Sequence, residues 1–222
     1  MIKFFKQDTI SLAKDLLGKL ILVKKDDEIL GGYIVETEAY LGSVDRACHG
    51  FEGKRTPKVE ALFGKAGTVY IYTMHPHKML NFVSCKEGNP QAVLIRGIEP
   101  VINVERMVEN RGKSGILVSN GPGKLTKAMG ISDKFNKSNI FEITKNFHKI
   151  TQELIYNSEN MKENLLYVDF ENSKIPKKIE ISARIGIPNK GVWTDKKLRY
   201  FVNGNKYVSK MKKSEYDNNC WK

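Results

Sequence analysis

The chain has 222 residues, of which 41% are hydrophobic and 28% charged, so it is long and apolar enough to fold around a core. Lys and Arg number 37 against 25 Asp and Glu, a formal net charge of +12 that favours a polyanionic partner. With this composition the chain need not be disordered, and no apolar run approaches the roughly 20 residues that span a bilayer.

The first predicted elements are a helix and a β-hairpin. Residues 8–18 carry an apolar stripe, with Asp8 or Thr9 as the N-cap and Gly18 as the terminator, so they predict a helix. Residues 19–24 and 29–41 predict two strands that pair across a turn at residues 26–27.

The middle of the chain predicts a loop followed by strands. Residues 42–66 are rich in glycine and charge, which indicates a functional loop. Strands are predicted over 67–74, 79–85 and 91–98, with the second between the other two, and a helix over 99–110.

The last third is less regular. Residues 119–130 predict a Gly-Pro turn that opens a short helix, and residues 134–175 a few short strands. Further short strands are predicted over the three ranges 180–188, 198–203 and 206–209. Helices and strands do not alternate, so we predict one α+β domain over residues 1–222 with a curved, mostly antiparallel sheet, flanking helices and a protruding hairpin. Residues 134–175 and 210–222 are expected to be its variable parts.

The positive charge lies mainly in the second half of the chain. Residues 1–100 hold 14 basic and 12 acidic residues, whereas residues 101–222 hold 23 basic and 13 acidic ones. A solvated face would explain this pattern, but we favour contact with nucleic-acid phosphates. A membrane surface is the weaker reading, because no basic amphipathic helix stands out.

The three cysteines, Cys48, Cys85 and Cys220, have no CxxC spacing. This sparse, odd set argues against a disulfide framework or a structural zinc site and for a reducing cytosol. The N-terminus lacks the apolar core of a signal peptide. We therefore expect a cytoplasmic protein, and the abundance of Lys, Asn and Ile indicates an AT-rich, bacterial genome.

The segment IVETEAYLGSVDRACHG, residues 34–50, is the sharpest candidate for chemistry. Alternation along a strand places Glu36, Glu38 and Tyr40 on one face. An exposed edge strand would give the same pattern. The neighbouring His49 and the aromatics Tyr70 and Tyr72, which recur at period two, however, favour a cleft for a flat, unsaturated ligand.

Several segments taken together resemble the alkyladenine (3-methyladenine) DNA glycosylase family. They are IVETEAYLG, the His eleven residues after Glu38, GTVYIY, AVLIRGIEP, SNGPGKL and ARIGI, and they run in the same order over nearly the whole chain. The resemblance implies a monofunctional glycosylase of base excision repair that flips a damaged purine from double-stranded DNA and hydrolyses its N-glycosidic bond. It implies a monomer with no metal and no organic cofactor.

The resemblance also implies roles for individual residues. Glu38 falls on the family's general base, and Arg96 and the backbone carbonyl of Ile185 on the groups that help hold the water. The base pocket would be walled by Tyr40, His49 and Tyr72, and Asn81 would discriminate among purines. Glu36 receives no catalytic role and is expected to pair with a cation, and Tyr70 is expected to pack.

This assignment suits the chemistry of alkylated purines. Alkylation at N3 or N7 makes the base cationic, so it leaves neutral and one general base suffices. Ordinary glycosidases use two carboxylates instead. Deaminated or etheno purines are neutral and need a proton for the leaving base, and no such acid can be assigned, so the lesion range stays open.

The hairpin tip departs from the family pattern, in which the best-known members insert a Tyr into the DNA stack. Here the sequence is YTMHPHKMLN, and Met74 or His75 takes that place. His75 and His77 could suggest a metal pair, but no third ligand is evident, and a role facing solvent or phosphate is favoured.

Two other motifs are weaker. SNGPGKL fails the Walker A pattern, because Val118 and Leu125 occupy required positions, yet its turn could present amides to one DNA phosphate with the help of Lys124. A plain helix cap explains it equally. Cys48 beside His49 is read as a packed thiol, since adjacent side chains on an extended chain point apart.

Two rival functions remain open at the level of sequence. One is a non-catalytic nucleic-acid-binding module of the same fold, and the other is an RNA-acting hydrolase with the same carboxylate.

Overall fold

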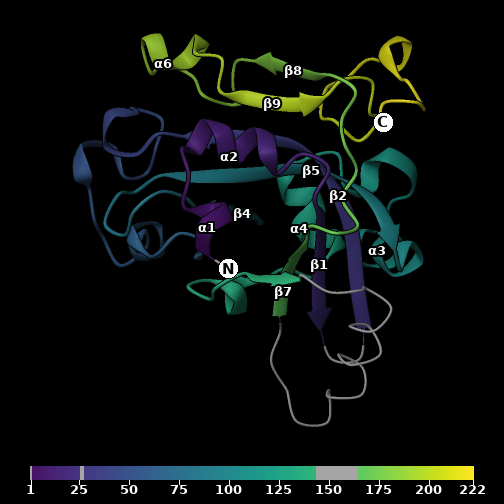
Figure 1. Ribbon diagram of the computed structural model, residues 1–222, viewed down its shortest axis with the longest axis horizontal. Coiled ribbons are helices and arrows are strands. Elements are labelled where there is room, and N and C mark those ends of the chain that lie inside the picture. Colours follow the sequence, from purple (N-terminus) through teal and green to yellow (C-terminus); the bar gives the residue numbers. More distant parts are fainter. Residues whose placement is uncertain (1, 26–27, 144–164) are drawn as a thin grey trace.

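The computed structural model describes residues 2–25, 28–143 and 165–222, which form one α+β domain around a curled, mostly antiparallel sheet (Figure 1). Its helices are α1 (Ile2–Phe5), α2 (Thr9–Asp15), α3 (Val104–Arg111), α4 (Pro122–Ala128) and α6 (Val192–Asp195). Its strands are β1 (Leu20–Lys25), β2 (Glu28–Tyr40), β3 (Val69–Met74), β4 (His77–Val83), β5 (Ala92–Ile102), β6 (Phe141–Ile143), β7 (Leu165–Asp169), β8 (Ile179–Ser182) and β9 (Arg199–Val202).

The sheet has the order β3-β4-β5-β2-β1-β7-β6, and β9 also pairs with β2 and with β8. The long strand β2 pairs with β1 over its first half and with β9 near Glu36 and Glu38, while β5 runs along its other edge. Register shifts between Ile34 and Thr37 interrupt the β2–β5 ladder. Such irregularities bend a strand, and here the bend lies next to the two glutamates.

The first predicted elements are confirmed. Asp8 is the N-cap of α2, because its carboxylate accepts a hydrogen bond from the backbone N–H of Ser11 at 2.8 Å. Gly18 lies in the left-handed region, at φ +82°, just after this helix. β1 and β2 pair as an antiparallel hairpin, and its predicted turn at residues 26–27 lies outside the described residues.

The central predictions are also largely confirmed. Residues 42–66 form a loop with three short 3-10 helices, at Gly42–Val44, Phe51–Gly53 and Glu60–Phe63. β4 lies between β3 and β5, and the β3–β4 hairpin ends in an exposed tip. The Gly-Pro turn opens α4, with Pro122 at its first turn.

Three predicted elements need correction: the helix predicted over 99–110 is confirmed only from Val104, as α3; the strand predicted over 180–188 ends with β8 at Ser182; and the strand predicted over 206–209 is absent. Residues 99–102 belong to β5 and not to a helix, because they pair with the start of β2 at Gly31, Gly32 and Tyr33. Residues 206–209 form turns and not a strand, because the side chain of Asn205 accepts a hydrogen bond from the N–H of Tyr207 and bends the chain. Within 134–175, β6 and β7 are strands as predicted, and residues 144–164 lie outside the described part.

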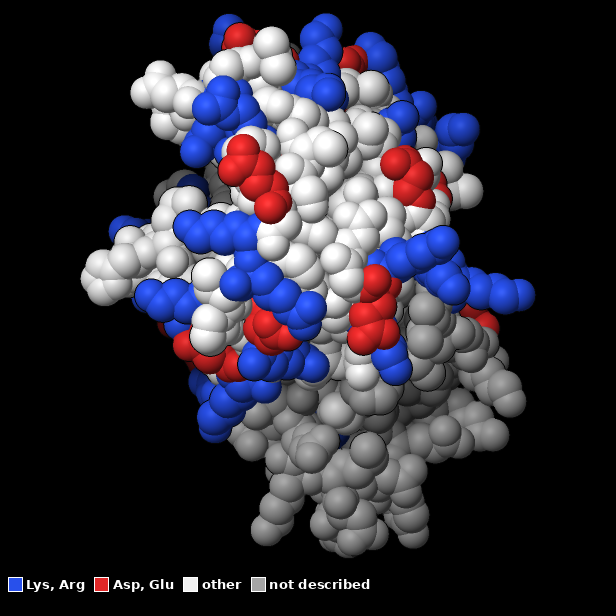
Figure 2. Space-filling model, turned by 90° about the vertical axis from the view of Figure 1, so that its left-hand side faces the viewer, with Lys and Arg blue, Asp and Glu red and all other residues white. Residues whose placement is uncertain are grey.

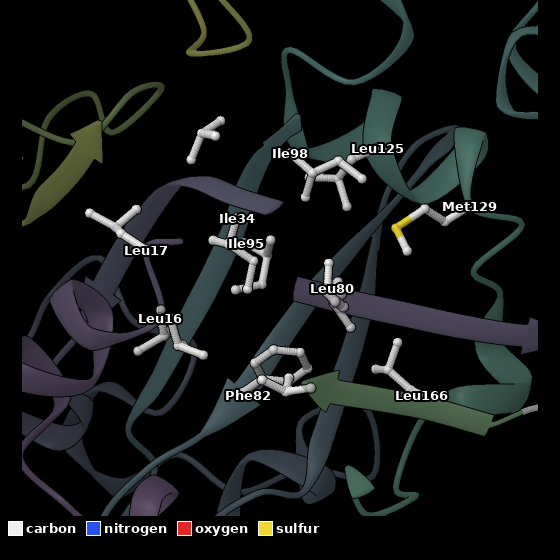
Figure 3. Packing of buried hydrophobic residues seen from close by; sticks show 14 of the residues in the cluster. Leu16, Leu17, Ile34, Leu80, Phe82, Ile95, Ile98, Leu125, Met129 and Leu166 are labelled. Atoms are coloured by element: carbon white, nitrogen blue, oxygen red, sulfur yellow. The ribbon is translucent and has the colours of Figure 1, made fainter. Parts of the chain in front are cut away.

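The core lies between the helices and the curled sheet (Figure 3). Leu16 and Leu17, at the end of α2, and Leu125, on α4, are buried against strand residues such as Ile34 and Ile95. Burial of each such side chain contributes roughly 1.5–3 kcal/mol. This packing fixes β2 and β5, the two strands that carry the candidate site.

Candidate active site

A cavity of about 290 Å³ lies between one face of strands β3, β4 and β5, the loop after β2 and the segment before α6. This volume is near the lower end of the ~300–1,000 Å³ that is typical of ligand pockets, and it suits one planar heterocycle. Its lining is mostly apolar and aromatic: Tyr40, Ala47, Cys48, His49, Leu62, Tyr70, Tyr72, Met74, Met79, Asn81, Ala92, Leu94, Arg96, Pro122, Ile185, Gly186 and Ile187. The cavity therefore gathers Tyr40, His49, Tyr72, Asn81, Arg96 and Ile185, all of which the sequence had singled out.

Glu38 lies directly behind the floor of this cavity. Its side chain is 0% exposed, and the Oε1 atom lies 3.2 Å from Nη1 of Arg96. The backbone N–H of Ile185 donates to Oε1 at 2.8 Å, and the Tyr40 hydroxyl donates to Oε2 at 2.9 Å. The sequence predicted that the backbone carbonyl of Ile185 helps to hold the water, whereas the contact observed here is from its N–H to Glu38. The carbonyl's role stays a prediction.

Burial raises the pKa of Glu38, and Arg96, Ile185 and Tyr40 offset only part of this rise. A carboxylate has about four acceptor positions. Among the described residues, three donors approach Glu38, one fewer than the number that its carboxylate can accept.

Glu36 has a different environment, although it shares the face and the burial of Glu38. Both are 0% exposed, so the reading as an exposed edge strand is wrong. Arg96, Arg199 and Ser209 all donate to the Glu36 carboxylate. Burial raises the pKa of Glu36, but these cations and hydrogen bonds outweigh it and lower the pKa below its usual value. Glu36 pairs with cations, as expected.

Aromatic rings form one wall of the cavity. The rings of His49 and Tyr72 pack edge to face, with 4.6 Å between the ring centres. Nδ1 of His49 lies 2.7 Å from the Tyr70 hydroxyl oxygen. Burial raises the pKa of Tyr72 to about 12, so it stays protonated. Partial burial and the nearby Lys190 lower the pKa of His49, so its ring is neutral at pH 7.

Tyr70 is a residue whose contribution the sequence reading missed. Tyr70 does more than pack in the core, because it lines the cavity and its hydroxyl holds the ring of His49 by a hydrogen bond. The period-two relation of Tyr70 to Tyr72 on β3 indicated a place beside the cleft, but the family resemblance implied no role for it, so only packing was predicted. Asn81 lies opposite, and its Nδ2 donates to the carbonyls of Tyr70 and Met79, both at 3.1 Å. The side chain of Asn81 is thereby fixed in the cavity wall.

A buried ion pair holds the loop that carries His49. Nη1 and Nη2 of Arg184 donate to the two oxygens of Asp45 at 2.6 and 2.9 Å, and both side chains are 0% exposed. Arg184 also donates to the carbonyl of Ala39 and lies 4.6 Å from the centre of the Tyr40 ring. The sequence reading missed both residues of this pair, although Arg184 directly precedes Ile185 in the ARIGI segment.

The predicted DNA wedge lies at the tip of the β3–β4 hairpin. Met74 is 58% exposed and lines the cavity, whereas His75 is exposed beyond it. His77, also exposed, packs against the backbone of Gly123 at the start of α4. Lys124 donates to Oδ1 of Asn120 at 2.7 Å. The contact of Lys124 with a DNA phosphate stays a prediction.

Cys48 is a packed thiol, as expected. It is 7% exposed, and burial raises its pKa to about 11, so it is not a nucleophile at neutral pH. Across the described residues, no three His, Cys, Asp or Glu side chains are grouped so that they could hold a metal ion. Within the same ranges, no helix combines the length and the apolar character that crossing a membrane requires.

Comparison with known proteins agrees with this site. Residues 3–206 match the family Methylpurine-DNA glycosylase (MPG). A protein of Staphylococcus saprophyticus is 48% identical over 212 residues, which are 96% of this chain and 94% of that protein. Proteins of Staphylococcus epidermidis and Staphylococcus aureus (strain JH9) are 46% and 44% identical, each over 99% of this chain and over 98% and 99% of their own lengths. All three carry the name "Putative 3-methyladenine DNA glycosylase". This chain therefore belongs to the methylpurine-DNA glycosylase family.

Proposed function

We propose that this protein is a monofunctional DNA glycosylase that flips alkylated purines out of double-stranded DNA and hydrolyses their N-glycosidic bonds in base excision repair. The observation that carries the proposal is the fully buried Glu38, 3.2 Å from Arg96, directly behind the lining of an aromatic cavity that fits one base. In this proposal Glu38 is the general base, and Arg96 and Ile185 help to place the water.

The ionised Glu38 takes a proton from the water as the water attacks the sugar carbon. The same negative charge stabilises the oxocarbenium-like sugar that forms as the bond to the base breaks. The N–C bond electrons leave with the cationic purine, which departs as a neutral base. No lysine lines the cavity in the described part of the chain, which supports hydrolysis by water over attack by an amine.

The cavity wall suits a cationic base. Aromatic rings attract a positive charge, and Tyr40 and Tyr72 both line the cavity, while the neutral His49 does not repel a cation. Flipping costs a few kcal/mol, less for a damaged base. Aromatic stacking returns roughly 1–3 kcal/mol per base. We propose that Met74 or His75 fills the gap that the flipped base leaves, with Met74 favoured because it also borders the cavity.

A second, larger cavity offers a path for the DNA backbone. Its volume is about 1,210 Å³, and His49, Tyr70, Tyr72 and Met74 line both cavities. Its charged residues are Arg46, Glu52, Lys54, Lys58 and Lys190, and its four cations are exposed. On the face drawn in Figure 2, Lys and Arg likewise cover more surface than Asp and Glu. We name the second cavity the basic groove.

Removing two cations of the basic groove is expected to weaken DNA binding without regard to the lesion. In the double variant Lys54→Ala, Lys58→Ala, affinity for damaged and undamaged duplexes falls by the same factor. The slope of log K against log salt becomes shallower by roughly two, about one for each DNA phosphate that is no longer neutralised. Fluorescence anisotropy at several salt concentrations measures both effects.

The matched control is Lys206→Ala, Lys222→Ala, which removes two exposed lysines near the C-terminus, away from the loop of residues 42–66 (Figure 1). This control changes the net charge equally. If both double variants bind DNA alike, the basic groove is not the DNA path.

The proposed function is tested by base release from duplexes that carry 3-methyladenine, 7-methylguanine, hypoxanthine or ethenoadenine. We expect release of the cationic bases and no strand cleavage without a later alkaline step. Binding of lesion DNA with no release of any base would favour the non-catalytic module. Faster release from the same lesion in RNA than in DNA would favour the RNA-acting hydrolase.

A further inference from the structure

We propose that Glu36 is a positioning residue for the Arg96–Glu38 pair, an inference that builds on the proposed function of Glu38. The observation that carries it is the way one guanidinium is shared. Nε of Arg96 donates to Glu36 at 3.0 Å, while Nη1 of the same group lies 3.2 Å from Glu38. Arg96 thus bridges two buried carboxylates that stand two residues apart on β2.

The Glu36 carboxylate is itself fully occupied. Oε1 accepts from Nε of Arg199 at 2.6 Å, and Oε2 accepts from the backbone N–H of Ser209 at 2.8 Å. The Ser209 hydroxyl lies 2.7 Å from both oxygens. A carboxylate with its acceptor positions filled has no place for a nucleophilic water. Glu36 can therefore orient Arg96 but cannot replace Glu38.

The surrounding fold is built to bring these donors together. The ladder of β2 shifts register beside Glu36. Gly97 lies opposite, and a Cβ there would lie 2.8 Å from the carbonyl oxygen of Tyr207, so only glycine lets the turn approach. That turn presents the N–H of Ser209, and Arg199 also donates to the Ser209 carbonyl at 2.9 Å. Three distant segments thus converge on one carboxylate.

This arrangement decides how Arg96 meets Glu38. A free guanidinium pairs with a carboxylate through two parallel hydrogen bonds. Because Glu36 takes the Nε edge of Arg96, only Nη1 reaches Glu38. Glu38 then keeps an acceptor position for water. Without Glu36, Arg96 can turn both donors toward Glu38, which would occupy that position and make the carboxylate a weaker base.

The titration of Glu38 gives a direct readout. The groups that act on it are Glu36 and Tyr40 on β2, Tyr72 on β3, Arg96 on β5, and Arg184 before Ile185. Arg199 lies opposite Glu38 in the ladder on β9, but its Nε donates to Glu36. The negative charge of Glu36 raises the pKa of Glu38. Loss of the Glu36 charge lowers the pKa of Glu38, and tighter pairing of Glu38 with Arg96 lowers it further.

The decisive experiment compares wild type with Glu36→Gln. The protein is labelled with ¹³C at the Glu side-chain carboxyl carbon, and the Glu38 signal is assigned from Glu38→Gln. We expect the midpoint of the Glu38 titration to move down by roughly one pH unit. We also expect the single-turnover rate of 3-methyladenine release at pH 7 to fall by about tenfold or more, and the acid limb of its pH profile to move to lower pH.

Glu99→Gln is the matched control. The Glu99 carboxylate also has several donors, with Lys174 at 3.0 Å and Trp221 at 2.9 Å, but it lies outside the base cavity. It should change neither the pH profile nor the Glu38 titration. If Glu36→Gln does not fold, Ser209→Ala takes its place, because it removes one hydroxyl donor from the Glu36 carboxylate. We expect it to shift the Glu38 titration and the acid limb of the pH profile in the same direction as Glu36→Gln, but by a smaller amount.

An unchanged Glu38 titration in a folded Glu36 or Ser209 variant overturns the proposal. So does a loss of rate with an unchanged acid limb, because that pattern indicates a purely structural role. If the wild type releases no base and the Glu38 pKa still falls in the variant, the proposed function fails while the positioning of Arg96 by Glu36 stands.

Discussion

Replacement of Glu38 by Gln is expected to lower the rate of base release by about 10³-fold or more. Loss of a positioned general base alone removes roughly 10²–10⁴-fold. Gln also loses the negative charge beside the developing oxocarbenium ion. Gln has nearly the same shape: its amide oxygen can accept from the Ile185 N–H while its amide N–H donates to the Tyr40 hydroxyl oxygen, so affinity for lesion DNA should change little. Single-turnover release and fluorescence anisotropy measure the two quantities separately.

The same variant has a second expected outcome, on stability. Burial raises the pKa of Glu38, so the folded state binds its proton more tightly than the unfolded chain does. At neutral pH the ionised Glu38 therefore disfavours folding. We expect the melting temperature of Glu38→Gln to equal or exceed that of wild type. Base release within tenfold of wild type would show that Glu38 is not the general base.

Replacement of Asp45 by Asn is expected to lower the free energy of unfolding by about 3–5 kcal/mol, the usual cost of leaving one buried partner of an ion pair uncompensated. Both Asp45 and Arg184 are 0% exposed, so water cannot replace the lost charge. Asp45 also accepts from the backbone N–H groups of Leu41 and Ala47 at 3.1 and 3.0 Å. The loop that leads to His49 should loosen together with the ion pair.

Urea denaturation of purified Asp45→Asn and wild type measures this difference. The control is Glu60→Gln, which removes the exposed ion pair between Glu60 and Arg55 and should leave the urea midpoint unchanged. A midpoint for Asp45→Asn equal to that of the control would show that the Asp45–Arg184 pair does not stabilise the fold. If Asp45→Asn stays folded below its midpoint, weaker binding of lesion DNA would follow from displacement of His49.

Much of the fold could be predicted because its elements depend on local patterns. The apolar stripe of α2, the alternation along β2 and β3 and the Gly-Pro turn before α4 are encoded within about a dozen residues each. One prediction failed because the pairing partner lies far away in the chain, and another failed because of a local turn. Residues 99–102 are strand because β2 pairs with them, and residues 206–209 are turn because Asn205 bends the chain.

The candidate site divides in the same way. Alternation alone placed Glu36 and Glu38 on one face, and the resemblance to a glycosylase family singled out Glu38, Arg96 and the rings around them. Local pattern could not reveal that this face is buried, that Arg96 bridges both carboxylates or that Asp45 pairs with Arg184 across 139 positions of the chain. Those features depend on desolvation and on contacts between distant segments, and a linear pattern carries neither. The sequence thus determined which residue types meet in this protein, while the tertiary structure decided that, within the described ranges, four donors surround Glu36 and three surround Glu38.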